Sequence, residues 1–239
     1  MDVNQLWRYP VKSMRGEPLT TAEITPEGIV GDRVVHVEND RGLVTARRRP
    51  ALLGLSATTG PDGRVLVDGR LWQDPEVGEQ VRAAAGPDAR LVAYEGPERF
   101  DILPLLVATD GAVAAFGRDG RRLRPNLVVG GVDGLAEREW EGRVLAIGPV
   151  LLHLDSLRQR CVMTTYDPDT LERDGEVLRD INRRFAGTLA LNTAVLRPGV
   201  VQVGDTVRLL TGQEAGDLLR AGLDGQGEVT GQPASMPSS

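Results

Sequence analysis

Short apolar runs separated by turn residues dominate the hydrophobic pattern of this chain. Turn signals such as Gly60-Pro61-Asp62-Gly63 and Gly130-Gly131 divide the runs. Many short strands at close spacing favour barrel-like sheets over a parallel α/β sheet, so the pattern predicts a mainly β fold with a few helices. The predicted strands are Val3–Arg8, Val34–Glu38, Leu52–Ala57, Arg64–Val67, Arg90–Tyr94, Leu105–Thr109, Leu127–Val129, Val144–Ile147, Val150–Leu154, Arg160–Thr165, Ala190–Leu196 and Thr206–Leu210.

Two segments have helical rather than strand periodicity. Glu176–Phe185 carries an apolar stripe at helical spacing, which is typical of a helix packed on a core. Asp110–Phe116 is shorter, and Asp110 stands where an N-cap is expected. Asp68-Gly69 lies between two apolar runs, so we predict a two-residue hairpin turn there.

The composition changes near Gly212. From there Gly, Gln, Ser and Pro accumulate, and apolar residues almost vanish at the end. Such a segment buries too little apolar surface to fold by itself. We therefore predict a flexible tail at 213–239, in which Glu214–Leu223 has the pattern of one weak helix.

Length and charge narrow the class of protein. The chain has 239 residues, enough for one large domain or two small ones with a real core. Its net charge of −6 argues against a general nucleic-acid binder. No stretch approaches the roughly 18 to 20 apolar residues of a membrane span, and no signal-peptide pattern is present. We expect a cytoplasmic protein that binds neither nucleic acid nor membrane.

The chain contains one cysteine, Cys161, between arginines and hydroxyl residues. A single cysteine forms no internal disulfide and cannot ligate an iron–sulfur cluster alone. His36 and His153 are isolated, so no zinc spacing exists. Cys161 could ligate a soft metal, act as a nucleophile, or be a small buried hydrophobe. A strand over Arg160–Thr165 would place Arg158 and Arg160 on the face opposite the thiol.

Three further segments carry candidate anion-binding groups. Lys12 is the only lysine among 28 basic residues, and Ser13 follows it just after Pro10; a point charge and a hydroxyl suit a phosphate. Arg47 begins a run of three arginines that ends at a proline, which suits a phosphate or carboxylate. Arg124 and Asn126 flank Pro125 before a buried strand. Gly31-Asp32-Arg33 reads as a turn with a local ion pair.

Together these segments resemble a known family. Along the chain stand Tyr-Pro-Val-Lys-Ser, Gly-Asp-Arg, Thr-Ala-Arg-x-x-Pro, Arg-Pro-Asn and Arg-Cys-x-x-Thr-Thr-x-Asp-Pro-Asp-Thr, followed by Val203-Gly204-Asp205-Thr206-Val207. The order is similar to that of MOSC-domain proteins, especially the amidoxime-reducing component and its bacterial relatives, over roughly residues 3 to 212. The resemblance implies an N-terminal MOSC β-barrel part at 1–95 and a MOSC domain at 96–212.

The resemblance also implies a molybdenum cofactor, in which a pterin dithiolene carries a phosphate. It assigns Cys161 as the molybdenum ligand and places Thr165 and Asp167 near the metal. It assigns the pterin and phosphate contacts to Lys12, Ser13, Arg47, Arg124 and Asn126, and we add Arg160 beside the cysteine. The lone Lys12 leaves binding of pyridoxal phosphate open as well. Many relatives have a cysteine where this chain has Met14.

The implied activity is reduction of small N-hydroxylated molecules such as amidoximes. With one cysteine, the chain cannot carry its own iron–sulfur cluster, so we expect electrons from a separate ferredoxin-like, flavin or haem protein. Two alternatives stay open. One is a sulfur transferase with a persulfide on Cys161, and the other is a carrier that binds the molybdenum cofactor without turnover.

Overall fold

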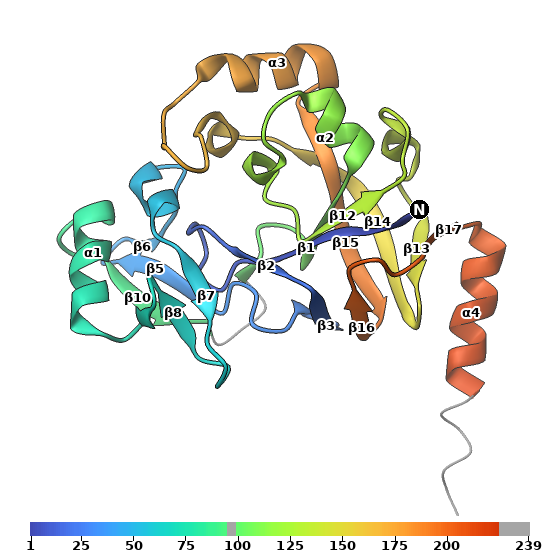
Figure 1. Cartoon of the computed structure of the whole chain (residues 1–239), viewed down its shortest axis with the longest axis horizontal. Coiled ribbons are helices and arrows are strands. Elements are labelled where there is room, and N and C mark those ends of the chain that lie inside the picture. The colour runs from blue at the N-terminus through green and yellow to red at the C-terminus, as the bar shows by residue number, and fades with distance from the viewer. Residues whose placement is uncertain (95–98, 225–239) are drawn as a thin grey trace, which may run out of the picture.

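The computed structural model describes residues 1–94 and 99–224 and is mainly β (Figure 1). Its largest sheet has the strand order β17-β13-β14-β15-β11-β12-β1-β2. β11 and β12 are parallel, and the other neighbours in this sheet are antiparallel. The strands are β1 (Asp2–Arg8), β2 (Glu17–Leu19), β11 (Leu105–Thr109), β12 (Leu127–Gly130), β13 (Val144–Ile147), β14 (Val150–Gln159), β15 (Thr188–Arg197) and β17 (Val207–Leu210).

The large sheet is curved, and its strand order ends at β17 on one side and at β2 on the other. The Val3 N–H donates to Asp205 O and the Val207 N–H donates to Met1 O, each at 2.9 Å. These bonds bring β17 beside the start of β1. The apolar side of the curl forms the main core, since residues such as Leu6, Leu145 and Leu152 are buried there. Burial of this continuous apolar face is the main driving force for the sheet.

Three smaller sheets complete the β structure. Their orders are β10-β5-β6, β16-β3-β4 and β7-β8-β9. The strands are β3 (Thr21–Thr25), β4 (Gly28–Ile29), β5 (Val35–Asn39), β6 (Gly42–Val44), β7 (Ala57–Thr59), β8 (Val65–Val67), β9 (Arg70–Leu71), β10 (Arg90–Ala93) and β16 (Gly199–Gln202). Asp68 and Gly69 join β8 to β9 with positive φ at both positions, which confirms the predicted hairpin.

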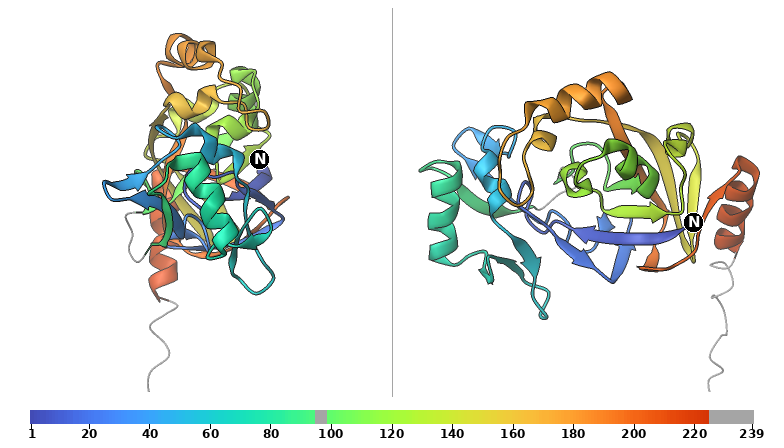
Figure 2. Two further views of the ribbon diagram at one scale, coloured as in Figure 1. Left: turned by 90° about the vertical axis from the view of Figure 1, so that its left-hand side faces the viewer. Right: turned by 45° about the horizontal axis from the view of Figure 1, so that its top comes forward.

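Within residues 1–94 and 99–224, four α-helices lie around the sheets: α1 (Pro75–Ala85), α2 (Asp110–Phe116), α3 (Gly175–Phe185) and α4 (Gly212–Asp224). Figure 2 shows α1 and α4 at opposite ends of the molecule, with α2 and α3 together on one side. α1 packs on a second core around Val37, Val67 and Leu52. Short 3-10 helices occur at η1 (Pro50–Gly54), η3 (Gly120–Leu123), η4 (Ala136–Glu139) and η5 (Val162–Thr165).

The two parts expected at 1–95 and 96–212 are interleaved. β1 pairs with β12, and β3 pairs with β16 near the other end of the chain. Strands from the two expected parts therefore share sheets in the described residues. The domain boundary expected near residue 95 stays a prediction. The mainly β fold with barrel-like sheets and few helices is confirmed, and the sheets of the described residues are not closed.

Three predicted elements differ from the structure. The strand expected over Leu52–Ala57 begins as η1, because Pro50 starts a helical turn that buries Leu52. The strand expected over Arg160–Thr165 is η5, where the Thr164 and Thr165 hydroxyls donate to carbonyls three residues back. The N-cap of α2 is Thr109 and not Asp110, since the Thr109 hydroxyl accepts from the Ala112 N–H.

The sequence pattern also missed α1 and understated α4. Asp74 caps α1 and Pro75 occupies its first turn, a start signal that was readable in the sequence. α4 extends over the start of the segment expected to be a flexible tail, and its Ala215 is buried against Leu151 and Leu210. The rest of that expected tail, 225–239, lies outside the described residues. Among the described residues no helix is long and apolar enough to cross a bilayer.

Candidate functional site

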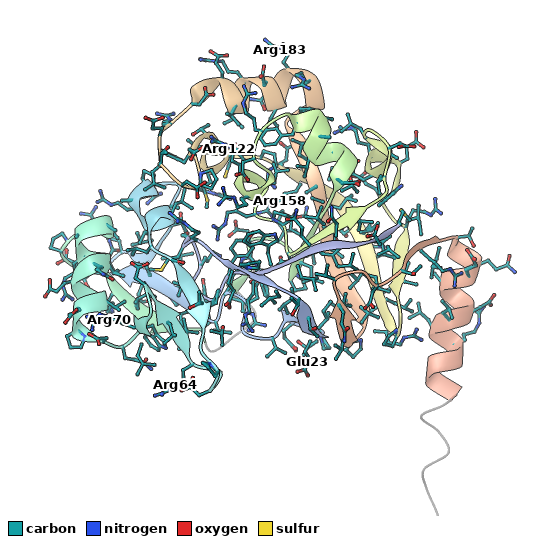
Figure 3. The ribbon with its side chains drawn as sticks, in the orientation of Figure 1. Glu23, Arg64, Arg70, Arg122, Arg158 and Arg183 are labelled. Carbon is teal, nitrogen blue, oxygen red and sulfur yellow. The ribbon has the colours of Figure 1, made fainter. Side chains whose placement is uncertain are left out.

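A cavity of about 260 Å³ collects basic side chains from both ends of the chain. Eight of its lining residues are cationic and one is acidic, although the whole chain carries a net charge of −6. The cations are Lys12, Arg33, Arg47, Arg99, Arg122, Arg124, Arg158 and Arg160, and the acid is Asp101. Figure 3 shows Arg122 and Arg158 near the centre of the molecule, while Arg64, Arg70 and Arg183 lie at its periphery.

Cys161 is half-buried and lines this cavity together with Arg158 and Arg160. The expectation that these arginines lie opposite the thiol is wrong, because β14 ends at Gln159. Cys161 then takes the N-cap position of η5, and its carbonyl accepts bonds from the Thr164 N–H and hydroxyl. The change from strand to helical turn brings the thiol to the cationic side.

Lys12 and Ser13 enter the cavity from the loop after β1. Lys12 is only 8% exposed, and its Nζ donates to Arg99 O at 3.0 Å and pairs with Asp101 Oδ1 at 2.9 Å. Ser13 has φ 73°, and its Oγ accepts from the Ala46 N–H at 3.0 Å. A positive φ in a non-glycine residue is held only by its surroundings, and such strain clusters at functional sites.

Arg124 is the least satisfied cation of the cavity. Its backbone is left-handed, with φ 54°, and its guanidinium lies 4.3 Å from the Tyr9 ring centroid. With the residues described here, that guanidinium makes no hydrogen bond or ion pair. Burial, with Arg33 nearby, lowers the pKa of Arg124 to about 10. A desolvated, unpaired guanidinium is costly unless an anion completes it.

Arg160 and Arg122 show the same shortage of partners. Arg160 donates from Nη2 to Leu123 O at 2.7 Å, but its Nε is buried without a partner among the described residues. Burial lowers the pKa of Arg160 to about 10, with Arg158 adding to the effect. The Arg122 Nε is also buried and unpaired in the same part of the chain. Unpaired donors around one cavity indicate a site built for an acceptor-rich anion.

Asp101 is held by three cations of the cavity. Lys12, Arg47 and Arg158 contact its carboxylate at 2.9, 3.2 and 3.1 Å. Burial alone would raise the pKa of Asp101, but the Lys12 bond and the nearby positive charges hold the pKa below its ordinary value. The carboxylate is therefore ionised near neutral pH.

Asn126 lines the cavity but its amide is already engaged. Its Oδ1 accepts from the Leu106 N–H at 3.2 Å and from Arg33, and its Nδ2 donates to Trp7 O at 3.3 Å. These bonds fasten β1, β11 and the start of β12 to one another. Asn126 thus holds in place the part of the cavity wall that includes Arg124.

Thr165 and Asp167 are not among the residues that line the cavity, and the position near the metal that the resemblance implies for them stays a prediction. Thr165 is buried and donates to Val162 O at 2.7 Å. Asp167 accepts from the backbone N–H groups of Thr170 and Asp169, which lower its pKa, and pairs with Arg122 at 2.9 Å. Both residues shape the turn after Cys161, and Asp167 orients one cavity arginine.

The sequence pattern missed Arg33, Arg99, Asp101 and Arg158 as lining residues. Gly31-Asp32-Arg33 is structural as expected, because buried Asp32 accepts from the Tyr9 N–H at 2.7 Å and pairs with Arg33. Arg33 also lies 5.0 Å from the Tyr9 ring centroid and faces the cavity. The sequence signal for Arg33 was its ion pair with Asp32 beside a glycine turn, but such a pair does not by itself identify a ligand.

Side chains alone do not form a metal site here. In the described ranges, no group of three or more His, Cys, Asp or Glu residues could hold an ion. A metal at Cys161 therefore needs most of its ligands from a cofactor. A soft thiolate beside eight cations suits a soft metal carried by an anionic, phosphate-bearing group.

Comparison with known families agrees with this geometry. The MOSC N-terminal beta barrel domain matches residues 1–90, and the MOSC domain matches residues 113–208. The chain belongs to the MOSC-domain family. Its cavity is lined by residues from both matched segments, with Lys12 and Arg47 in the first and Arg124 and Cys161 in the second.

Curated relatives of this MOSC protein carry a functional name. Human and mouse mitochondrial amidoxime-reducing component 1 are each 28% identical to it, over 87% of this chain and 82% of theirs. Human mitochondrial amidoxime reducing component 2 is 28% identical over 70% of this chain and 67% of its own. The similarity therefore extends through both MOSC segments.

Proposed function

We propose that this protein binds a molybdenum cofactor in the Cys161 cavity and reduces N-hydroxylated substrates such as amidoximes. The observation that carries the proposal is the pairing of a lone thiol with eight cations in one cavity of a net acidic chain. The amidoxime-reducing names of its relatives support the choice of substrate.

The cavity residues divide into two roles in this proposal. Cys161 is the protein ligand to molybdenum, because a thiolate is the soft donor that such a metal prefers. Lys12, Arg47, Arg124 and Arg160 bind the phosphate and pterin of the cofactor through charge-assisted hydrogen bonds. Of these, the Arg160 Nε and the Arg124 guanidinium have no partner among the described residues, so they are the donors that the cofactor would complete. Lys12 and Arg47 are paired with Asp101 in the structure.

Ser13 and Asn126 position these groups. The Ser13 Oγ accepts from the Ala46 N–H and so ties the Lys12 loop to the turn that carries Arg47. Asn126 holds the ends of three strands together beside Arg124. Rigid placement matters because a cofactor site works only when its contacts are preorganised.

When bound, the cofactor supplies two-electron redox chemistry that removes oxygen from an N–O bond. The overall reaction takes up two electrons and two protons and releases the reduced nitrogen compound and water. The chain's own residues bind, orient and shield the reacting groups. Electrons come from a separate ferredoxin-like, flavin or haem protein, since one cysteine cannot hold an iron–sulfur cluster.

The first test is the molybdenum content of the full chain purified from a host that makes the cofactor. We expect near one molybdenum per chain, and loss or lability of the metal in Cys161→Ser with an unchanged melting temperature. The wild-type protein should reduce an aromatic amidoxime with a chemically reduced viologen as electron donor, and Cys161→Ser should not.

Other results would point to other functions. Bound molybdenum without amidoxime reduction would favour a cofactor carrier. Absence of molybdenum in both proteins, with cofactor synthesis in the host verified, would refute the proposal. Cyanide-labile sulfur on Cys161 would then favour a sulfur transferase. Pyridoxal phosphate has no support from Lys12, whose Nζ is already held by Asp101 and Arg99 O.

The cytoplasmic location expected from the sequence stays a prediction. The curated relatives are named as mitochondrial proteins, which describes those proteins alone. The absence of nucleic-acid binding stays a prediction as well. The basic side chains named here face a cavity lined by both MOSC segments, which suits a small anion.

A further inference from the structure

Asp101 is the one acidic residue among those that line the cationic cavity. Its carboxylate lies where cations from three different parts of the chain converge. Lys12 follows β1, Arg47 lies in the turn after β6, and Arg158 stands on β14. Such convergence of cations on two oxygens is the arrangement expected around a bound anion.

The contacts of Asp101 differ in number from the other ion pairs of the described residues. Arg121 with Asp169 and Arg90 with Glu38 also join residues 48 and 52 positions apart, but each of those carboxylates is contacted by one arginine. Asp101 is contacted by three cations, and its hydrogen bonds from Arg47 and Arg158 span 54 and 57 residues. Convergence of three cations on one carboxylate sets Asp101 apart from the other acids.

Hydrogen bonds also connect the backbone near Asp101 to the cations around its carboxylate. Lys12 Nζ, which pairs with Asp101, also donates to Arg99 O at 3.0 Å, and Arg99 donates to Glu27 O at 2.8 Å. The carboxylate itself remains 41% exposed. It can therefore leave its cations for solvent by side-chain rotation, while the backbone stays in place.

We propose that the Asp101 carboxylate occupies an anion position of the cavity and acts as a tethered competitor, which an incoming anion such as a phosphate must displace and which thereby lowers the affinity of the cavity for every such anion. The inference deepens the proposed function, because the cofactor phosphate is the anion that would displace it. It rests on that proposal only for the identity of the natural ligand. The competition itself concerns residues of this chain.

The physical reason is intramolecular competition for the same cations. The tether gives the Asp101 carboxylate a high effective concentration, so each anion that displaces it loses apparent affinity by the same factor. A singly charged anion gains little Coulomb energy from the exchange. A phosphate group carries about −1.5 to −2 at pH 7 and three acceptor oxygens. It therefore gains both charge and hydrogen bonds from Lys12, Arg47 and Arg158.

The test compares two probes, inorganic phosphate and acetate, by isothermal titration calorimetry. The full chain is produced in a host that does not synthesise the molybdenum cofactor, and the pH is fixed at about 8, where phosphate is mostly dianionic. The variants are Asp101→Asn, Asp101→Glu and the control Asp169→Asn, which removes an exposed carboxylate paired with Arg121 outside the cavity.

We expect the wild-type chain to bind phosphate and to discriminate strongly against acetate. Asp101→Asn should bind both anions more tightly by about tenfold each, which corresponds to about 1.4 kcal/mol, and leave the phosphate-to-acetate ratio nearly unchanged. Asp101→Glu should keep both affinities close to those of the wild type, since it retains the tethered charge. Asp169→Asn should leave both affinities unchanged.

Three results would overturn the inference. The first is a wild-type chain that does not bind phosphate, and the second is a phosphate affinity in Asp101→Asn equal to that of the wild type. The third is loss of binding of both anions in Asp101→Asn with an unaltered melting temperature, which would show that the carboxylate organises the cations. Molybdenum content is measured separately, so failure of the proposed function leaves the competition result interpretable, and the reverse also holds.

Discussion

Replacing Arg124 by methionine should stabilise the cofactor-free chain and weaken its binding of anions. The guanidinium of Arg124 is half-buried, lies over the Tyr9 ring, and makes no hydrogen bond or ion pair within the described part of the chain. Methionine keeps the apolar stem and the same left-handed backbone strain, because both residues have a Cβ. The substitution therefore removes the charge with little change in packing.

The magnitude follows from the lowered pKa of Arg124. A shift from the ordinary 12.5 to about 10 is equivalent to about 3 kcal/mol of unfavourable charge burial. Loss of the cation–π contact with Tyr9 offsets about 1 kcal/mol of the gain. The net stabilisation of about 2 kcal/mol should raise the melting temperature by roughly 4–8 °C in a chain of this size.

The sign is fixed by proton linkage. A lowered pKa means that folding disfavours the protonated form of Arg124, so the cost is fully present at neutral pH. It is relieved only as the pH rises from about 10 toward the unfolded value. The comparison of the two proteins near pH 7 thus captures the whole effect.

The assay is thermal unfolding of the full cofactor-free chain, followed by titration with inorganic phosphate. Arg183→Met is the matched control, because that side chain is 73% exposed and should change stability by less than about 0.5 kcal/mol. A melting temperature that falls in Arg124→Met, or phosphate affinity equal to that of the wild type, would refute the reasoning.

Two further predictions test the frame around the site. Glu137 is fully buried, its Oε1 has no partner among the described residues, and burial raises its pKa. Ionisation of Glu137 therefore destabilises the fold as the pH rises above the ordinary range for Glu. Glu137→Gln should raise the free energy of unfolding by about 1 kcal/mol or more at pH 7 but not at about pH 4. Melting curves at both pH values measure this, and an equal shift at both would contradict the prediction. In Gly111→Ala, a Cβ would lie 2.5 Å from Gly134 O and 2.8 Å from Gly134 N, so we expect the free energy of unfolding to fall by about 2–3 kcal/mol in chemical denaturation. Gly117→Ala is the control, because its Cβ would meet nothing within 4 Å and it should show only the smaller cost of a positive φ.

Local signals in the sequence determined much of the secondary structure. Leu105–Thr109 and Val144–Ile147 form strands with the predicted bounds, and Asp110–Phe116 forms the predicted helix. Each is an apolar run or stripe bounded by turn or capping residues, so its pattern is set within a few residues. The short strands β2 and β4 escaped prediction because they have only three and two residues, too few to show an alternating pattern, and they form by pairing with β1 and β3. β9 is the second strand of the predicted Asp68-Gly69 hairpin.

The proposed site residues divide in the same way. The motifs around Lys12, Ser13, Arg47, Arg124, Asn126 and Cys161 were readable, and the structure gathers all six around one cavity. The place near the metal that the resemblance gives Thr165 and Asp167 stays a prediction, whereas the strand expected over Arg160–Thr165 is wrong, because the hydroxyls of Thr164 and Thr165 close a helical turn. One local backbone choice thus moved the thiol to the same side as Arg158 and Arg160.

The sequence by itself determined the mainly β class, the strongest elements and the motifs that carry the chemistry, since these depend on neighbouring residues. Only the tertiary structure decided which charges meet. Asp101 contacts Lys12, Arg47 and Arg158, which are distant in sequence, whereas Arg124 makes no hydrogen bond or ion pair with the described residues and lies over the Tyr9 ring. Charge pairing at such range is set by how the strands close around the core, because Coulomb energy depends on distance in space and not along the chain.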